Sequence, residues 1–349
     1  MTGLAFTPSR HVSALAALLL LAALAGGVKL ATVGTTPNSD YDSYIATAQL
    51  FSGLPASEHP ERILKPLAPL AVALVAPVLG FPQGFVFVAF VFYLAFAAAL
   101  YALGWAFFRD RFAAVCVALL GALSYPLLRY GVDLYTETGA LFLFVLSLYL
   151  LLHYAKEPSA RLVMANASVI GIALLWKEYS VVAGLAFGLL LLFERNAWKI
   201  KIGRLTLLAL FSIAPTLLVQ VWVYLTYGYT YLDWYVSGGA SGFATEFTLT
   251  NLVKSTAALL GVAWLFVPLG LHRFASLPQP SRAFLFSVIP ATMACFAWGY
   301  VSSRLFYVMA PAFLLLAVLG LSRLPRGLQY AGLGVSLAAN IIWLYVATS

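Results

Sequence analysis

The sequence predicts an all-α, polytopic transmembrane protein with about eleven spans, forming a single transmembrane domain over residues 1–349. Composition is the first observation behind this class: 63% of the 349 residues are hydrophobic and only 9% are charged, whereas soluble domains are about half apolar and a quarter charged. The second is the gathering of the apolar residues into long runs with few charges. The third is that Cys116 and Cys295 both lie inside such runs, as small buried hydrophobes do. Together these observations exclude a soluble enzyme, a disordered chain and a disulfide scaffold.

Eleven apolar runs are expected to cross the membrane, because about 20 helical residues span the hydrocarbon core and shorter runs borrow flanking positions. In chain order they are residues 11–33, 85–108, 112–128, 138–152, 162–176, 179–193, 205–227, 255–271, 283–301, 305–321 and 328–347. No small-residue cleavage site follows the first run, so we expect a retained span and not a signal peptide. Prolines 215, 268, 290 and 311 fall inside four runs, where we expect kinks without breaks.

One further segment, Pro66 to Gly80, decides the orientation of the whole chain. It is apolar but short and contains three prolines. If it does not cross, thirteen of the 20 Lys and Arg residues lie on the cytoplasmic side, and if it crosses only five do. Because cytoplasmic loops are enriched in Lys and Arg, the segment is not expected to span. The thirteen are Arg10, Arg109, Arg111, Lys156, Arg161, Arg195, Lys199, Lys201, Arg204, Arg273, Arg282, Arg323 and Arg326.

This choice places the amino terminus in the cytoplasm and makes residues 34–84 one long external loop with juxtamembrane helices. Long loops in an otherwise short-looped chain often carry function. Nine of the 12 acidic residues also fall outside: Asp40, Asp42, Glu58, Glu61, Asp133, Glu137, Glu178, Asp233 and Glu246. Such an outer face is typical of a site that needs both carboxylates and cations, although interfacial snorkelling and surface solvation would produce the same sorting.

The start of this loop, Asn38 to Gly53, predicts a short amphipathic helix that lies flat on the membrane and ends at its glycine. The residues on its apolar face recur at i, i+3, i+4 and i+7: Tyr41, Tyr44, Ile45 and Ala48. Asp40 and Asp42 stand at its beginning. Their spacing alone favours helix capping and a favourable helix-dipole interaction over catalysis.

Five external cations have the chemistry to bind a lipid phosphate, provided that the helices bring them to one cavity. They are Arg62, Lys65, Arg129, Lys177 and Arg304. Considered alone, each of them is explained at least as well as an ordinary juxtamembrane cation as it is by a role in binding phosphate. The external stretch Tyr227–Phe247 is rich in aromatic residues and glycines, which favours an interfacial aromatic belt over a cover for a sugar or lipid site. No metal-ligand spacing and no nucleotide-binding motif is present, and the basic excess does not indicate a nucleic-acid partner.

These motifs together resemble the GT-C superfamily of integral-membrane glycosyltransferases, most closely the branch with lipid A aminoarabinose transferases and protein O-mannosyltransferases. The features that carry the resemblance, in chain order, are Asp40 with Tyr44 and Gly53, the step Lys65-Pro66, the turn Trp105 to Arg111, the turn Tyr135-Thr136-Glu137, Lys177, and the helix Arg304 to Pro311. The resemblance covers most of residues 10–325, and each motif is short.

The resemblance implies an inverting transferase of the plasma (inner) membrane. Its active site, facing the outside or periplasm, moves a sugar from a polyprenyl-phosphate-linked donor to a hydroxyl of a glycan, lipid or protein acceptor. No cofactor and no metal ligand are assigned, and the metal requirement of the reaction stays open. It makes Asp40 the base, with Asp42 in reserve because the acidic pair of the family is adjacent and here is split by a tyrosine. The expected ligands of the donor phosphate are Lys65, Arg62, Lys177, Arg304 and Arg129, and the expected substrate contacts are Tyr44, Tyr135 and Glu137.

Two other classes of function remain open. A lipid or sugar transporter or flippase would predict inverted repeats and charges near the bilayer midplane, and the sequence shows neither. A non-catalytic subunit of a cell-envelope assembly complex is compatible with the charge sorting. Many members of the family carry a soluble external domain after their spans, and this sequence ends after its eleventh, so acceptor recognition is expected to use short loops or a partner.

Overall fold

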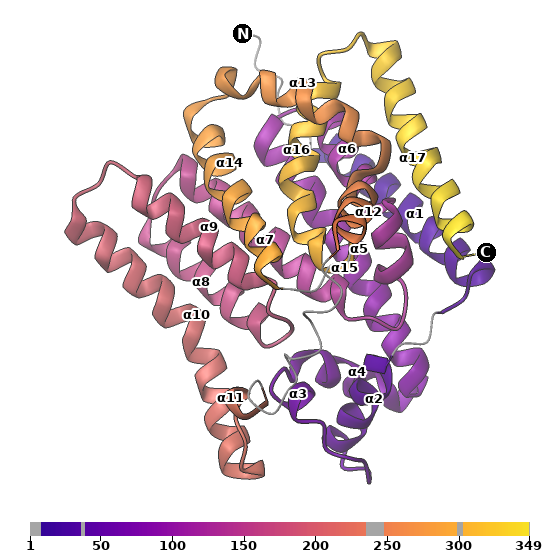
Figure 1. The fold of residues 1–349 in the computed structure, drawn as a ribbon, viewed down its shortest axis with the longest axis vertical. Helices are drawn as coiled ribbons and strands as arrows, with labels where there is room; N and C mark the ends of the chain where they lie inside the picture. The colour runs from indigo at the N-terminus through magenta and orange to yellow at the C-terminus, as the bar shows by residue number, and fades with distance from the viewer. Residues whose placement is uncertain (1–7, 36–38, 235–247, 299–302, 349) are drawn as a thin grey trace.

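In the computed structural model, every regular element of the described residues is a helix (Figure 1). The structure describes residues 8–35, 39–234, 248–298 and 303–348. Seven helical segments are long and apolar enough to cross a membrane: His11–Thr32, Phe81–Phe108, Glu137–Lys156, Trp198–Tyr227, Leu249–His272, Arg304–Leu321 and Arg326–Ala347. Four shorter apolar helices accompany them, namely α4 (Leu67–Leu79), α6 (Arg111–Ala122), α8 (Ala160–Leu174) and α9 (Ser180–Phe193). The expected all-helical membrane protein is confirmed.

Each of the eleven predicted runs overlaps a helix. The long helices are α1 (Pro8–Thr32), α5 (Phe81–Phe108), α7 (Glu137–Lys156), α10 (Trp198–Tyr227) and α17 (Arg326–Thr348). The later spans are built from α12 (Leu249–Leu260), α13 (Val267–His272), α14 (Gln279–Thr292), α15 (Ser303–Phe306) and α16 (Ala310–Leu321), joined by 3-10 segments. Helices α6, α8, α9 and α14 have only 12 to 15 residues. Because a crossing takes about 20, the count of eleven spans stays a prediction.

The prolines behave in two different ways. Pro215 lies inside α10, which continues past it as expected, and Pro290 lies inside α14, which ends at Thr292 and is followed by a 3-10 segment. Pro268 and Pro311 instead stand in the first turn of α13 and α16, after 3-10 segments. Proline costs no helical hydrogen bond in a first turn, because the N–H at that position has no partner within the helix. The expectation of an unbroken kink at these two prolines was therefore wrong.

Close helix contacts build the centre of the bundle. In the most apolar 18-residue stretch of the span Arg304–Leu321, 83% of the residues are buried in the protein. In the corresponding stretch of α10, at the rim of the bundle, 17% are buried. Small residues allow this packing: a Cβ atom added at Gly104 of α5 would lie 3.0 Å from the backbone of Ala114 in α6. A Cβ atom at Gly270 of α13 would lie only 2.0 Å from the carbonyl oxygen of Leu316 in α16. Helices in lipid associate through such close packing, because burial from water no longer drives them together.

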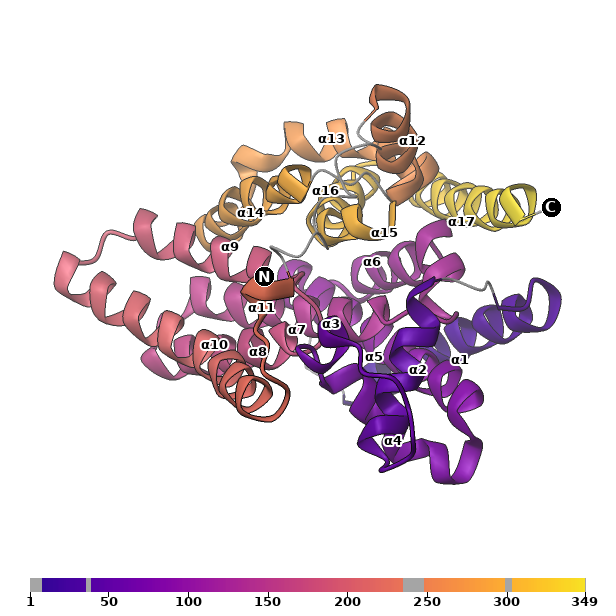
Figure 2. The same ribbon diagram turned by 60° about the horizontal axis from the view of Figure 1, so that its bottom comes forward.

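The first external loop folds against one end of this bundle, where Figures 1 and 2 show α2, α3 and α4 together. The predicted amphipathic helix exists as α2 (Ser39–Phe51). Its face with Tyr44 and Ala48 is buried against the protein, with Tyr44 edge-on to Phe85 of α5. The expected contact of this face with the bilayer surface was wrong, because α4 and α5 supply the apolar surface that covers it.

Helix α4 occupies the proline-containing segment whose crossing decided the orientation. It has 13 residues, which makes it about 20 Å long, against a hydrocarbon core of about 30 Å. Its start is tied to the α8–α9 connection, since the Leu67 N–H donates to the Leu175 carbonyl at 3.2 Å. At Gly80, which has φ +78°, the chain turns directly into α5. Because α6, α8 and α9 are about as short, length does not distinguish α4 from the predicted spans, and the expectation that it does not cross stays a prediction.

The count of Lys and Arg residues assigned the loops to two opposite sides of the membrane. No ion pair among the described residues joins a loop of one side to a loop of the other. The most buried pair joins Lys29, near the end of α1, to Asp133 in the α6–α7 connection at 2.8 Å, with side chains 1% and 0% exposed. The partition of the loops therefore agrees with the structure, and the side that faces the cytoplasm stays a prediction.

We expect Lys29→Met to lower the stability of the protein strongly, because it leaves the Asp133 carboxylate buried without its cation. Breaking a buried pair from one side costs about 3–5 kcal/mol. The double variant Lys29→Met/Asp133→Asn should recover much of this loss, since it buries no charge. Thermal unfolding in detergent micelles measures both, and equal stability of the single and double variants would contradict the prediction.

Candidate active site

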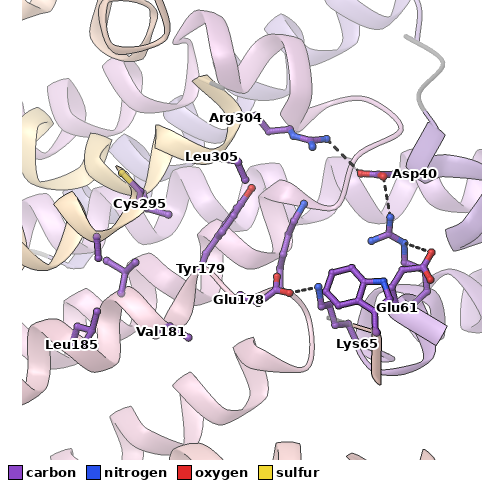
Figure 3. Close-up of a pocket in the computed structure, with 16 residues that line it drawn as sticks. Asp40, Glu61, Lys65, Glu178, Tyr179, Val181, Leu185, Cys295, Arg304 and Leu305 are labelled. Carbon is purple, nitrogen blue, oxygen red and sulfur yellow. Dashed lines mark ion pairs between the residues drawn. The ribbon is translucent and has the colours of Figure 1, made fainter. Parts of the chain in front are cut away.

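A cavity of about 460 Å³ lies where α2 and α3 (Pro60–Ile63) meet the beginnings of α9 and α15 (Figure 3). One end of it is polar and the other is apolar. The charged side chains that line the polar end are Asp40, Glu61, Arg62, Lys65, Lys177, Glu178 and Arg304. They come from the first external loop, the α8–α9 connection and α15, so the fold brings together segments that are far apart in the sequence.

Asp40, in the first turn of α2, lies between two guanidinium groups. Its Oδ1 is 2.9 Å from Arg62 and its Oδ2 is 3.6 Å from Arg304. Burial by itself would raise the pKa of the Asp40 carboxyl, but Arg62, Lys177 and Arg304 together hold this pKa below its usual value. Asp40 is therefore ionised at neutral pH, with its side chain 34% exposed. Asp42 is exposed and does not line the cavity.

Arg62 is held in place from two sides. Its Nε donates to Ser43 Oγ at 2.9 Å and its Nη1 donates to the Tyr44 hydroxyl at 3.2 Å. The guanidinium also lies 4.2 Å from the centre of the Tyr44 ring, a favourable cation–π distance. The Tyr44 hydroxyl accepts a second hydrogen bond from Thr136. Tyr44 is fully buried, so it orients Arg62 from behind the cavity and does not line it.

Lys65 lies in the short connection between α3 and α4 and pairs with Glu178. The Tyr231 hydroxyl donates to the same carboxylate. The ammonium also lies 5.4 Å from the ring centre of Tyr231 and 5.1 Å from that of Trp234, both in α11 (Tyr231–Trp234). Burial would raise the pKa of the Glu178 carboxyl, but the Lys65 ammonium lowers it to about 2.

A third pair lies deeper. Lys177 is 2.6 Å from Glu137, and Arg304 is 3.3 Å from the same oxygen, Oε1. Burial would lower the pKa of the Lys177 ammonium, but the Glu137 carboxylate raises it above its usual value. Arg304 also lies 4.9 Å from the ring centre of Tyr135. The Oε2 atom of Glu137 and the hydroxyl of Tyr179 are buried and lack hydrogen-bond partners among the described residues, so two buried polar atoms near Lys177 are left without a hydrogen bond.

The apolar end of the cavity runs along the first turns of α9. Val181 and Leu185 of α9 and Leu305 of α15 line it. The side chains of Val181 and Leu185 are 44% and 47% exposed. The cavity therefore joins a charged end to an exposed apolar flank.

The structure brings most of the predicted site residues together. Asp40, Arg62, Lys65, Lys177 and Arg304 line the cavity. Tyr44, Tyr135 and Glu137 form the layer behind these charges. Asp42 and Arg129 are not part of it, since Arg129 donates to the Tyr125 hydroxyl and to the Ala347 carbonyl near the end of α17.

Sequence reasoning missed Glu61, Glu178 and the aromatic cover of Lys65. The aromatic stretch Tyr227–Phe247 was the available signal, and its interpretation as a membrane belt overlooked that Trp234 lines the cavity. Residues 235–247 of this stretch lie outside the described residues. In the part of the chain that the structure describes, no three His, Cys, Asp or Glu side chains are grouped to hold a metal ion.

Comparison with solved structures identifies the fold. ArnT, the lipid A aminoarabinose transferase of Cupriavidus metallidurans, in a structure bound to undecaprenyl phosphate, matches 95% of this chain with a TM-score of 0.67 and 13% sequence identity. The chain has the GT-C fold. Apo ArnT matches 94% of it with a TM-score of 0.64 and 15% identity. An oligosaccharyltransferase of Archaeoglobus fulgidus, tethered to an acceptor peptide, matches 98% with a TM-score of 0.58 and 16% identity.

The matches also differ from this chain in length. It spans 63% and 64% of the two ArnT chains and 55% of the oligosaccharyltransferase. No family model and no curated protein sequence matches it. The GT-C resemblance expected from the motifs is thus confirmed at the level of the fold, and the chain is an integral membrane protein.

The pair formed by Lys65 and Glu178 should make the stability of the protein depend on acid pH. The folded-state pKa of Glu178, about 2, lies below the value of about 4.3 for an unpaired Glu. The stabilisation is therefore full above about pH 4.3 and is lost as the pH falls towards 2. The melting temperature, measured from pH 6 to pH 2, should fall less steeply in Glu178→Gln than in wild type. The exposed Glu58→Gln is the matched control, and a Glu178→Gln profile parallel to wild type would contradict the prediction.

Proposed function

We propose that this protein is an inverting membrane glycosyltransferase that moves a sugar from a polyprenyl-phosphate-linked donor to an acceptor hydroxyl. The observation that carries the proposal is the cavity, in which Asp40 and two further carboxylates lie among four cations at one end and an apolar flank opens at the other. By the predicted orientation, the cavity faces the outside of the plasma membrane and the amino terminus lies in the cytoplasm.

The two ends of the cavity suit the two parts of such a donor. A polyprenyl chain is apolar and fits the exposed flank along Val181 and Leu185. The phosphate fits the polar end, where Lys65, Lys177 and Arg304 supply the charge-assisted hydrogen bonds that phosphate oxygens favour. The ArnT structure with undecaprenyl phosphate supports this class of lipid, since it has the same fold.

The chemistry assigned to the site is a single displacement. Asp40 accepts the proton of the acceptor hydroxyl, and the hydroxyl oxygen attacks the anomeric carbon of the sugar. The bond from this carbon to the phosphate oxygen breaks, and polyprenyl phosphate leaves with the electron pair. A positioned base contributes about 10²–10⁴ in rate, and the cations stabilise the charge that develops on the leaving phosphate. Attack from the side opposite the phosphate inverts the anomeric carbon.

The three remaining predicted residues, Tyr44, Tyr135 and Glu137, contact the cations of the site. Tyr44 orients Arg62, and Tyr135 packs against Arg304. Glu137 bridges Lys177 and Arg304 through one oxygen, and its side chain is only 2% exposed behind the cavity. We therefore assign positioning of the cations to Glu137 and to the two tyrosines.

We expect Asp40→Asn to abolish sugar transfer, with a loss of about 10²-fold or more, because an amide cannot accept the proton. Transfer is measured with the purified protein in nanodiscs, supplied with radiolabelled polyprenyl-phosphate hexoses and a membrane extract as the source of acceptor. Asp42→Asn is the matched control and should retain activity, since Asp42 is exposed outside the cavity.

The same assay separates the alternatives. Normal turnover of Asp40→Asn would contradict the role of Asp40. Absence of transfer by the wild-type protein across the donor panel would favour a transporter or a non-catalytic subunit of an envelope complex.

Donor binding is expected to depend on Lys65. Lys65→Gln removes a charged hydrogen-bond donor and should weaken binding of undecaprenyl phosphate about tenfold or more. Glu178→Gln should keep or strengthen binding, because the carboxylate that competes with phosphate for Lys65 is gone. Microscale thermophoresis with labelled protein measures both variants. Equal affinities in wild type and Lys65→Gln, or lipid density at the bilayer midplane in a structure of the complex, would oppose the proposal.

A further inference from the structure

A second, larger cavity of about 640 Å³ lies at the far end of α9 from the active site. The last residues of α9 and the first turns of α14 form its walls, and the α9–α10 connection forms its rim. The proposed reaction uses none of its residues. By the predicted orientation, this end of the bundle faces the cytoplasm.

The charge balance of this cavity is positive. Its one carboxylate, Glu194, is already neutralised by Arg204 at 2.8 Å and accepts a hydrogen bond from Asn196 at 2.6 Å. Two further lining residues, Arg195 and Arg282, are exposed, and within the described residues their guanidinium groups have no hydrogen-bond or ion-pair partner. The cavity therefore presents two unpaired positive charges from two different segments.

The rim is also preorganised. Arg204 donates to the hydroxyl of buried Tyr154 at 2.6 Å while it holds Glu194. Lys201 donates to the carbonyl of Leu192 at 2.7 Å, which ties α10 to the last turn of α9. These contacts fix the backbone on which Arg195 stands, so an anion bound there would not have to order a loose loop.

Apolar surface continues directly from the two arginines. Phe193 of α9 and Phe286 of α14 pack edge to face with ring centres 5.5 Å apart. Their side chains are 64% and 56% exposed, and both line the cavity. Cations at a helix end beside exposed aromatic surface match a lipid with a charged head and apolar chains, and basic pockets between transmembrane helices bind anionic lipid headgroups.

We propose that this cavity binds an anionic phospholipid, with its phosphate between Arg195 and Arg282 and its acyl chains over Phe193 and Phe286. The site is separate from the donor cavity, although α9 contributes to both. A lipid bound here holds α9 against α14 at the end remote from the reaction, and this role does not depend on the proposed transfer activity.

The test is native mass spectrometry of the delipidated full-length protein titrated with phosphatidylglycerol, cardiolipin or phosphatidylcholine. Wild type should bind the two anionic lipids about tenfold better than phosphatidylcholine, and Arg195→Gln/Arg282→Gln should lose this preference. The conservative pair Arg195→Lys/Arg282→Lys should retain most of it. The matched control is Arg161→Gln/Arg323→Gln, which removes two exposed cations of the same predicted side outside the cavity.

Each outcome decides the proposal. A preference lost in the cavity variant and kept in the control supports it, and a rise in melting temperature with anionic lipid in wild type alone supports it further. Equal losses in both pairs, or no preference in wild type, would overturn it. In a final experiment, glycerol phosphate, which has no acyl chains, competes with the anionic phospholipid for the protein. If it competes as well as the whole lipid, the site binds a free anion and the lipid assignment is wrong.

Discussion

The pairing of buried charges is the constraint on which the organisation of this protein depends. Eight charged side chains meet in or behind the cavity of the candidate site: Asp40, Glu61, Arg62, Lys65, Glu137, Lys177, Glu178 and Arg304. An unpaired charge at such a place costs several kcal/mol. Close packing of small residues assembles the bundle, but it does not select which loop lies over which helix end. The ion pairs of Lys65, Lys177 and Arg304 do so, since each joins two segments that are distant in the sequence.

Much of the fold was predictable from the sequence, because a helix that crosses lipid must be long and apolar. Long apolar runs can be recognised directly in the amino-acid sequence. The predictions that were wrong concerned features that depend on tertiary contacts. The apolar face of α2 was assigned to the bilayer, and it packs on α4 and α5. Pro268 and Pro311 were expected inside continuous helices, and they begin new ones. In each case the local pattern permits two environments, and only the tertiary contacts select one.

The site was predictable to the extent that its chemistry is local. Sorting the scarce charges by side limited the candidates, and the family resemblance then selected Asp40, Arg62, Lys65, Lys177 and Arg304, which the fold brings to one cavity. The choice between Asp40 and Asp42 was not available, because two residues along a helix turn a side chain by about 200° and the sequence does not say which direction faces the cations. Arg129 shares the side and the chemistry of the others but bonds to the end of α17. Glu178 was overlooked because its importance arises from Lys65, more than a hundred residues earlier.

The carboxylates that pair with the cations of the cavity affect how an anion binds there. Four cations and three carboxylates line the cavity, so a phosphate does not enter an empty positive pocket but replaces carboxylates as the partner of the same cations. Arg304 contacts both Asp40 and Glu137. When a phosphate takes Arg304, Asp40 loses one of the charges that hold its pKa down, and its pKa rises towards the ordinary value. Because a carboxylate with a higher pKa is a better base, donor binding would itself strengthen Asp40 as a base, and the acceptor hydroxyl would be activated only when a donor is in place. In the proposed mechanism, the pairing that stabilises the site would thus also couple the arrival of the donor to the chemistry.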